Sequence, residues 1–401
     1  MSLAERKWLA ITIIAVIIVA AVVGVGVWLL TRPAPGPISP IKIGFHAPLT
    51  GFAAADGYSA LHGALLAVRH INEAGGVLGR PLQLIYYDDK CNPDEAVAIA
   101  HKLIEEDRVV AAVSGSYSHP TLAASPIFDE AGVPYISAYA VHPDIVKDKP
   151  HVFRVGLNGQ CEGKSMGYIA FDKLGARKVA ILCMDIPFGI TLADNAKAYI
   201  EGKGGEIVYY EKYELGETDF SAWLTEIKSL QDAGNLDALL VTAYYSEAAH
   251  ICKQARDMGI TVPIVGCEGF DSPKFLELAG DAAEGVIIVT DLNRDSESEL
   301  VQRFLADYRA ETGIPADMVG ASAYDAVFVL AKAIEKAGST DPAKICDALR
   351  SFRDVELVTG ILKYFTEQGN ACKTMVAQIV ENGEFHFYAE ITDPDLITPP
   401  E

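Results

Sequence analysis

Residues 113–143 read VSGSYSHPTLAASPIFDEAGVPYISAYAVHP. The apolar run Val109 to Val113 predicts a buried strand, and the Ser- and Gly-rich residues after it predict a turn. Pro120 suits the first position of a following helix, because an N–H at that position needs no partner, and Ser118 is placed to cap that helix. Val133 to Ser137 predicts the next strand. The segment is therefore interpreted as a strand–helix–strand unit of an α/β fold.

Two turns at the ends of these strands, at Ser118 and at Ser137 to Val141, predict half of a binding site. Ligands of open α/β sheets sit outside the carboxyl ends of the strands. A helix N-terminus presents unpaired N–H groups and a partial positive charge, so the turn at Ser118 can hold a carboxylate. An ordinary capped helix would have the same local sequence, and both interpretations remain open on these residues alone.

Composition excludes several classes of protein. The 401 residues suffice for two or three domains, and half of them are hydrophobic. The net charge of −21 argues against nucleic-acid partners, which require clustered lysine and arginine. None of the seven cysteines forms a close CxxC pair, so we expect no zinc or redox motif.

Sequence signatures of catalysis and cofactor binding are also missing. The chain has no phosphate-cradling GxxxxGK[ST] and no HExxH, and its one GxSxG match, GKSMG at 163–167, follows no predicted strand directly and so does not mark a nucleophile elbow. We therefore expect no enzyme activity, no cofactor and no metal. Asp88 and Asp89 could bind a metal, but a carboxylate pair at a strand end is more often a hydrogen-bonding device.

The N-terminal segment predicts a membrane helix. Trp8 to Leu30 carries no charged residue and is long enough to span a bilayer, and Arg6 and Lys7 favour a cytoplasmic N-terminus. The long apolar core without a cleavage site favours an uncleaved anchor, with a cleaved signal sequence and a periplasmic protein as the alternative. Thr31 to Pro40 contains four prolines and predicts an extended linker. The rest of the chain should lie outside the cytoplasm.

From Ile41 onward, strands and helices alternate, which predicts parallel sheets covered by helices. The predicted strands are too numerous for one comfortable sheet, so we expect two lobes with a cleft between them. Tyr244 and Glu268 each follow a predicted strand and should face that cleft. A carboxylate at Glu268 is a natural partner for an ammonium group, with a solvated loop charge as the alternative.

Six segments of the chain, in order, resemble type I periplasmic binding proteins, in particular the leucine/isoleucine/valine-binding proteins of ABC importers. They are PLTG at 48–51, INEAGGVLGRPLQLIYYDDKCNP at 71–93, PTLAASPIFDEAGVPYIS at 120–137, TDFSAWLTEIK at 218–228, KQARDMGI at 253–260 and AGDAAEGVIIVT at 279–290. The resemblance covers Ile41 to Tyr388.

The resemblance implies two doubly wound lobes joined by a three-crossover hinge, preceded by the N-terminal transmembrane helix. Crossovers placed near 157, 291 and 361 divide the chain into three parts. These parts are an anchor and linker at 1–40, a first lobe at 41–157 plus 291–360, and a second lobe at 158–290 plus 361–395.

Ligand contacts of the family fall on residues of both lobes. The serine that binds the ligand carboxylate matches Ser118, and the acidic residue that binds the ammonium matches Glu268. The second-lobe tyrosine matches Tyr244. The residue whose carbonyl holds the ammonium matches Tyr139.

Other positions depart from the family pattern. Val141 stands where a ligand-binding threonine is usual, so that only its amide is retained, and Asp56 stands where a tyrosine is usual. Phe188 aligns with another aromatic residue. Tyr117 replaces the family's disulfide partner of Cys91, so that bridge is absent. The aromatic residues Phe52, Tyr139, Phe188 and Tyr244 suit a pocket for a larger apolar side chain.

The resemblance implies an extracytoplasmic solute-binding protein. It should capture an amino acid or close analogue, with a branched-chain or aromatic side chain, and deliver it to the permease subunits of an ABC importer. A sensor ectodomain for amides or carboxylic acids is the alternative. Cys346 and Cys372 lie in segments that are close in sequence, and we hypothesise a disulfide between them.

Overall fold

The computed structural model describes residues 2–31 and 39–400, which fall into an N-terminal unit and a large compact body that begins at Pro40. The N-terminal unit is the helix α1 (Leu3–Thr31). Its 21 residues Leu3–Val23 are apolar enough to cross a membrane and span roughly 31 Å at 1.5 Å per residue. Signal sequences meet the same criterion. Most of the predicted linker, residues 32–38, lies outside the described residues.

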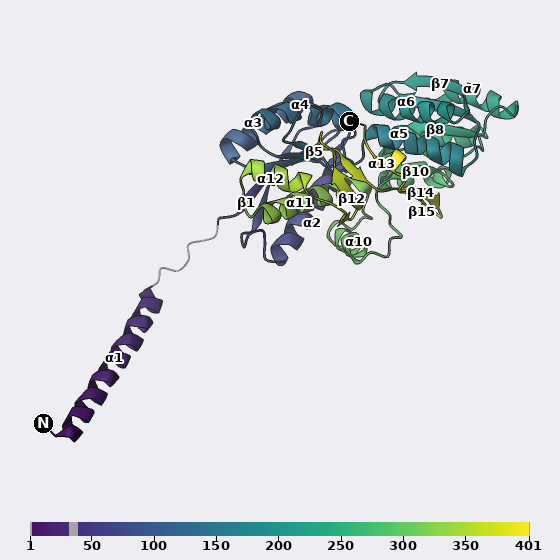
Figure 1. Ribbon diagram of the computed structural model, residues 1–401. Coiled ribbons are helices and arrows are strands. Elements are labelled where there is room, and N and C mark those ends of the chain that lie inside the picture. Colours follow the sequence, from purple (N-terminus) through teal and green to yellow (C-terminus); the bar gives the residue numbers. More distant parts are fainter. Residues whose placement is uncertain (1, 32–38, 401) are drawn as a thin grey trace. The chain divides into compact units, whose positions relative to one another are not determined.

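The first lobe of the body is built on a parallel five-stranded sheet in the order β2-β1-β3-β4-β5. Figure 1 shows α3 and α4 at one side of this lobe and α2 at the other. The strands are β1 (Ile41–Ala47), β2 (Leu82–Asp88), β3 (Ala111–Ser114), β4 (Tyr135–Ser137) and β5 (Val152–Arg154). The helices are α2 (Ala54–Glu73), α3 (Pro93–Lys102), α4 (Ser118–Glu130), α10 (Glu299–Thr312), α11 (Met318–Ala337) and α12 (Pro342–Arg350).

The second lobe is built on a seven-stranded sheet in the order β15-β14-β10-β9-β8-β6-β7. Its strands are β6 (Lys178–Met184), β7 (Glu206–Tyr213), β8 (Ala238–Thr242), β9 (Ile264–Gly266) and β10 (Ile287–Thr290), with β14 (Met375–Glu381) and β15 (Glu384–Ile391) antiparallel. Its helices are α5 (Gly159–Tyr168), α6 (Pro187–Gly202), α7 (Ser221–Asp232), α8 (Tyr245–Asp257) and α9 (Pro273–Ala279).

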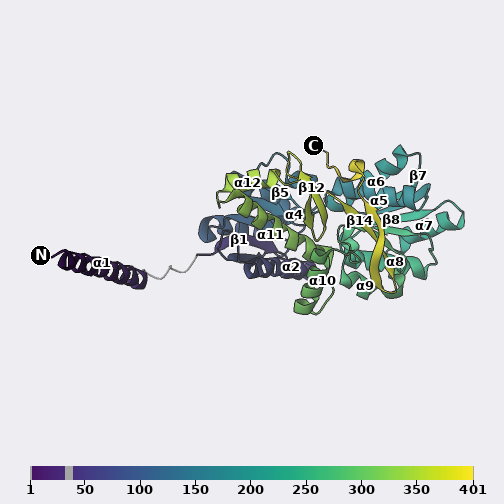
Figure 2. The ribbon, with the colours of Figure 1, turned by 60° about the horizontal axis from the view of Figure 1, so that its bottom comes forward.

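A small third sheet joins β11 (Val355–Leu357), β12 (Gly360–Phe365) and β13 (Ala371–Lys373), and the helix α13 (Pro394–Ile397) ends the chain. The two lobes lie side by side, with β12 between them (Figures 1 and 2). The chain passes from the first sheet to the second after β5 and returns to the second sheet at β14. The domain boundaries near 157, 291 and 361 remain a prediction.

Local sequence signals account for several element ends. The side chain of Asn92 accepts hydrogen bonds from the N–H groups of Asp94 and Glu95 and caps α3, as its place before Pro93 predicts. The turn between β14 and β15 holds Asn382 at φ 55° and Gly383 at φ 76°, the geometry that an Asn-Gly pair favours in a two-residue hairpin turn.

The helix after β3 begins earlier than predicted. Ser118 is not its cap but its first residue, and Tyr117 is the residue that precedes it in extended conformation. Pro120 is therefore the third residue of α4. A proline fits there because the N–H groups of the whole first turn have no partner within the helix.

The predicted disulfide between Cys346 and Cys372 is wrong, because all seven cysteines are free thiols. Cys346 lies on α12 of the first lobe, whereas Cys372 lies on β13, with its Sγ 3.7 Å from Thr398 Oγ1. Proximity along the chain therefore did not bring the two side chains together.

The carboxylates of Asp88 and Asp89 accept hydrogen bonds from the protein. The sequence analysis favoured this role over metal binding. Asp88 Oδ1 accepts the N–H groups of Leu49 and Lys90 at 2.8 and 2.9 Å. Asp89, fully buried, lies 2.6 Å from Nδ1 of His46. Both side chains fasten the loops that follow β1 and β2.

Candidate ligand-binding site

One cavity of the body is lined by residues of both lobes, and all seven predicted site residues line it. The first lobe contributes Asp56, Ser118, Tyr139 and Val141, and the second contributes Phe188, Tyr244 and Glu268. The other lining residues are Tyr117, Ala140, Gly269, Asp271, Ser272, Met318 and Val319.

The order of the strands places these residues. In the first sheet β1 lies between β2 and β3, and in the second sheet β6 lies between β7 and β8. In each lobe the chain therefore goes first to one side of the starting strand and then crosses to its other side. Ligands of doubly wound sheets bind at such switch points, outside the carboxyl ends of the strands. Ser118 follows β3 and Val141 follows β4, while Tyr244 follows β8 and Glu268 follows β9.

Stacked aromatic rings fill much of the cavity. The ring of Tyr117 from the first lobe stacks on Tyr244 from the second, with centroids 4.4 Å apart, and Phe188 stacks on the same tyrosine at 4.9 Å. Tyr139 meets Tyr117 edge to face at 6.1 Å. About 30 Å³ of free space remains, which is enough for one or two water molecules. Binding of an amino acid therefore requires these rings or the lobes to move apart.

Asp56, in the first turn of α2, is a buried acid at the cavity. Its Oδ2 accepts a hydrogen bond from the Tyr117 hydroxyl at 2.6 Å. Burial, followed by the negative charge of Asp317, raises the pKa of Asp56 to about 7. The carboxyl group is therefore divided between its neutral and charged forms near neutral pH.

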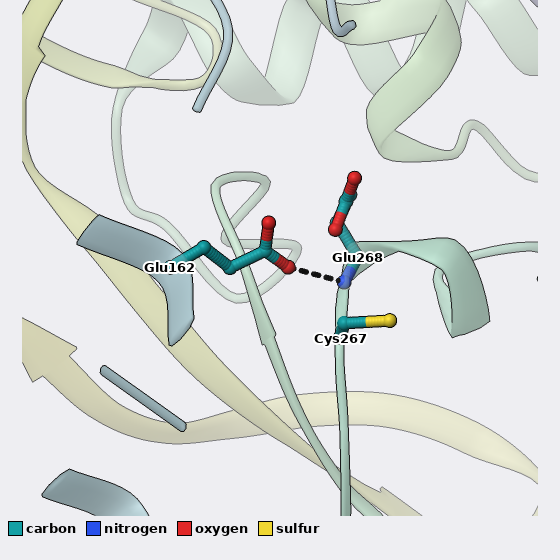
Figure 3. Close-up of side chains that lie close together, drawn as sticks. All are labelled: Glu162, Cys267 and Glu268. Carbon is teal, nitrogen blue, oxygen red and sulfur yellow. Dashed lines mark hydrogen bonds between the residues drawn. The ribbon is translucent and has the colours of Figure 1, made fainter. Parts of the chain in front are cut away.

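A second buried acid stands behind Glu268. Glu162, on α5, reaches across to Glu268 and accepts its backbone N–H at 2.8 Å (Figure 3). One carboxyl oxygen of each residue, Oε2, is buried without a hydrogen-bond partner among the described residues. Burial is the largest cause of the raised pKa of both carboxyl groups. We expect this pair to hold a proton when the cavity is empty.

The same pair and the Cys267 thiol form a candidate metal group, since one donor atom of each lies within 4.8 Å of the others. Metal binding would require the thiolate. Burial raises the pKa of Cys267 well above its usual value, and its Sγ lies 3.4 Å from the Ala243 carbonyl oxygen, to which the thiol donates. These properties favour a neutral thiol and disfavour a metal.

Among the residues that the structure describes, Asp271 is the one acidic lining residue that has a counter-charge. It forms an ion pair with Arg294, whose Nη1 also lies 2.8 Å from the Gln378 side-chain oxygen. Thr290 donates a further hydrogen bond to Asp271 at 2.7 Å. Its charge is therefore neutralised within the protein.

The model of the periplasmic binding protein family matches residues 40–384, which is most of the chain. The chain belongs to this family. It is a family of solute-binding proteins, not of enzymes. The N-terminal apolar helix and the family together place the body outside the cytoplasm.

Individual relatives are similar over most of their length. The leucine-, isoleucine-, valine-, threonine- and alanine-binding protein of Pseudomonas aeruginosa is 32% identical, over 82% of this chain and 87% of its own. A leucine-binding protein from Thermotoga maritima has a TM-score of 0.80 at 30% identity, covering 88% of this chain and 99% of that one. A branched-chain amino acid transporter substrate-binding protein from Streptococcus pneumoniae, solved with isoleucine, has a TM-score of 0.80 at 32% identity with the same coverage.

The structure of this periplasmic binding protein also reveals cavity residues that the sequence analysis missed. Tyr117 directly precedes Ser118 in the same turn, so the rule that selected the serine applied to it as well. Asp271 lies three residues beyond Glu268, after the same predicted strand, whereas Glu162, which stands behind Glu268 and does not itself line the cavity, follows no predicted strand end. Phe52, in contrast, does not line the cavity: its side chain is exposed, and its backbone carbonyl accepts the Tyr245 hydroxyl at 3.1 Å.

Proposed function

We propose that the protein binds an amino acid or close analogue between its lobes and delivers it to the permease subunits of an ABC importer. The observation that supports this most is the meeting of seven predicted residues from two lobes in one cavity. A carboxylate would lie at the N-terminus of α4, near Ser118 and the amide of Val141, and an ammonium group at Glu268.

Apolar walls complete the proposed site. Tyr139, Phe188 and Tyr244 suit the branched-chain or aromatic part of a side chain. The relatives' own ligands support the same class, since the Streptococcus pneumoniae protein was solved with isoleucine. The three crossovers near 157, 291 and 361 would act as the hinge on which the lobes open and close.

We further propose that α1 is an uncleaved anchor that keeps the body at the outer face of the cytoplasmic membrane. The helix has no charged residue from Trp8 to Leu30, and no cleavage signature follows it.

A thermal-shift screen against the amino acids, small amides and urea tests the binding function. A ligand that binds only the folded state raises the melting temperature, by an amount that grows with its concentration. We expect one or more α-amino acids to do so. A response to amides or to simple carboxylic acids alone would instead support the sensor alternative.

A further inference from the structure

The polar lining of the cavity is strongly acidic. Of the described residues, three carboxyl groups line it, from Asp56, Glu268 and Asp271, and no lysine, arginine or histidine does. Asp271 is neutralised by Arg294. Neither Asp56 nor Glu268 forms an ion pair within residues 2–31 and 39–400. Two buried acids of the cavity therefore lack a positively charged partner. A ligand could supply one to each of them.

On the second-lobe side of the cavity, two acids lie close together. Glu268 and Glu162 place carboxyl oxygens within 4.8 Å of each other, and each keeps one buried oxygen without a partner in the described chain. Buried acceptors without partners are costly. An ammonium group, with three donors, would satisfy both oxygens and compensate the charge.

The acid at the first-lobe end is separate from this pair. Asp56 belongs to α2, is 7% exposed, and receives one hydrogen bond, from the Tyr117 hydroxyl, on a single carboxyl oxygen. The neighbouring charge that raises its pKa most is that of Asp317, another acid. An apolar side chain placed here would desolvate Asp56 further and offer it nothing in return.

Aromatic rings line the same cavity as the two acids. Tyr117, Tyr244 and Phe188 form a continuous stack, and Tyr139 packs on its edge. Ring faces attract cations, and they also pack well against the methylene groups of a long charged side chain. An apolar stem with a cationic end therefore suits both the walls and the acids.

We propose that the ligand is an α-amino acid whose side chain ends in a second cationic group, with its α-ammonium at Glu268 and Glu162 and its side-chain cation at Asp56. This inference rests on the proposed amino-acid function and narrows its side chain. The apolar walls then contact the methylene stem of the ligand's side chain, and Asp56 requires a cationic group at the end of that side chain.

Calorimetry with the full chain in detergent tests this inference by comparing lysine with norleucine, which has the same four-carbon stem without the terminal amine. Since hydrogen bonds to charged groups contribute about 1.5–3 kcal/mol, lysine or its shorter analogue ornithine should bind roughly 10- to 100-fold more tightly than norleucine. Asp56→Asn should remove most of this preference. Asp94→Asn, an exposed acid on α3, is the matched control and should keep it.

The outcomes separate this inference from the proposed function. If norleucine or leucine binds the wild-type protein as tightly as lysine and ornithine, the cationic requirement is wrong and the amino-acid function stands. If only a diamine such as cadaverine binds, both proposals fail; if none of these compounds binds, the cationic requirement is wrong, and the amino-acid function fails as well only if no other amino acid responds in the thermal-shift screen. The comparison of lysine with norleucine uses the wild-type protein, so it decides the question even if Asp56→Asn does not fold.

Discussion

Glu268→Gln is the substitution that reports most directly on the ammonium group of the ligand. Glu268 is 8% exposed and lines the cavity, so the exchange replaces a buried carboxylate by an amide of nearly the same shape. Removing one partner of a buried charge pair costs about 3–5 kcal/mol. At 1.4 kcal/mol for each tenfold change, affinity should fall by more than about 100-fold.

The structure limits this loss at its upper end. Glu162 keeps a carboxyl oxygen close to the replaced group and can partly compensate the positive charge of the ammonium group. We therefore expect a loss near 100-fold rather than several thousand-fold. Ser118→Ala should cost less, roughly 1–3 kcal/mol, because backbone N–H groups at the start of α4 still face the carboxylate.

Isothermal calorimetry on both variants, with the tightest-binding α-amino acid from the screen, measures these losses. Glu277→Gln is the matched control, since this exposed glutamate lies on α9 and should leave affinity unchanged. Unchanged or improved binding by Glu268→Gln would refute the reasoning. The ligand would then carry no ammonium group at this position.

Other measurements test the remaining claims. Burial raises the pKa of Asp56 from 3.8 to about 7, so its neutral form stabilises the empty protein at low pH and this stability is lost as the pH rises through 7. Asp56→Asn should therefore raise the melting temperature at pH 8, by roughly 1–2 °C per kcal/mol gained, and have little effect near pH 4; a lower melting temperature at pH 8 contradicts this. Glu162→Gln should also raise the melting temperature at pH 8, because the amide oxygen still accepts the Glu268 N–H without a buried charge. A large destabilisation would show that the pair of Glu162 and Glu268 does not destabilise the empty protein. Membrane fractionation should find the protein in the membrane with residues Trp8 to Leu30 retained, whereas N-terminal sequencing that begins near Pro33 would mean a cleaved signal. Mass mapping without reductant should find Cys346 and Cys372 as free thiols, and a linked peptide would contradict the structure.

The sequence predicted the layers of this fold because its signals are local. Apolar runs, glycine pairs and caps such as Asn92 depend on near neighbours, and they placed the strands in nearly the observed positions. The helix after β3 was misplaced by two residues, because Pro120 is compatible with any position of a first turn. The second-lobe site residue Glu268 was found because it follows a strand.

Contacts that depend on tertiary packing could not be predicted in this way. Glu162 lies 106 residues from Glu268 in the chain, and only the packing of α5 against the second-lobe sheet brings them together. The hydrogen bond from Tyr117 to Asp56 likewise joins the turn before α4 to the first turn of α2 across 61 residues. The false disulfide at Cys346 and Cys372 shows the converse, since closeness in sequence was taken for closeness in space.

Solution scattering tests the central claim, which is that two lobes close on an amino acid. The measurement uses a truncated protein that starts at Pro40, where the compact body begins, with and without a saturating amount of the amino acid selected by the screen. The account predicts that the radius of gyration falls on binding, because residues of both lobes such as Ser118 and Glu268 must reach one ligand. An unchanged radius of gyration at saturation would contradict it.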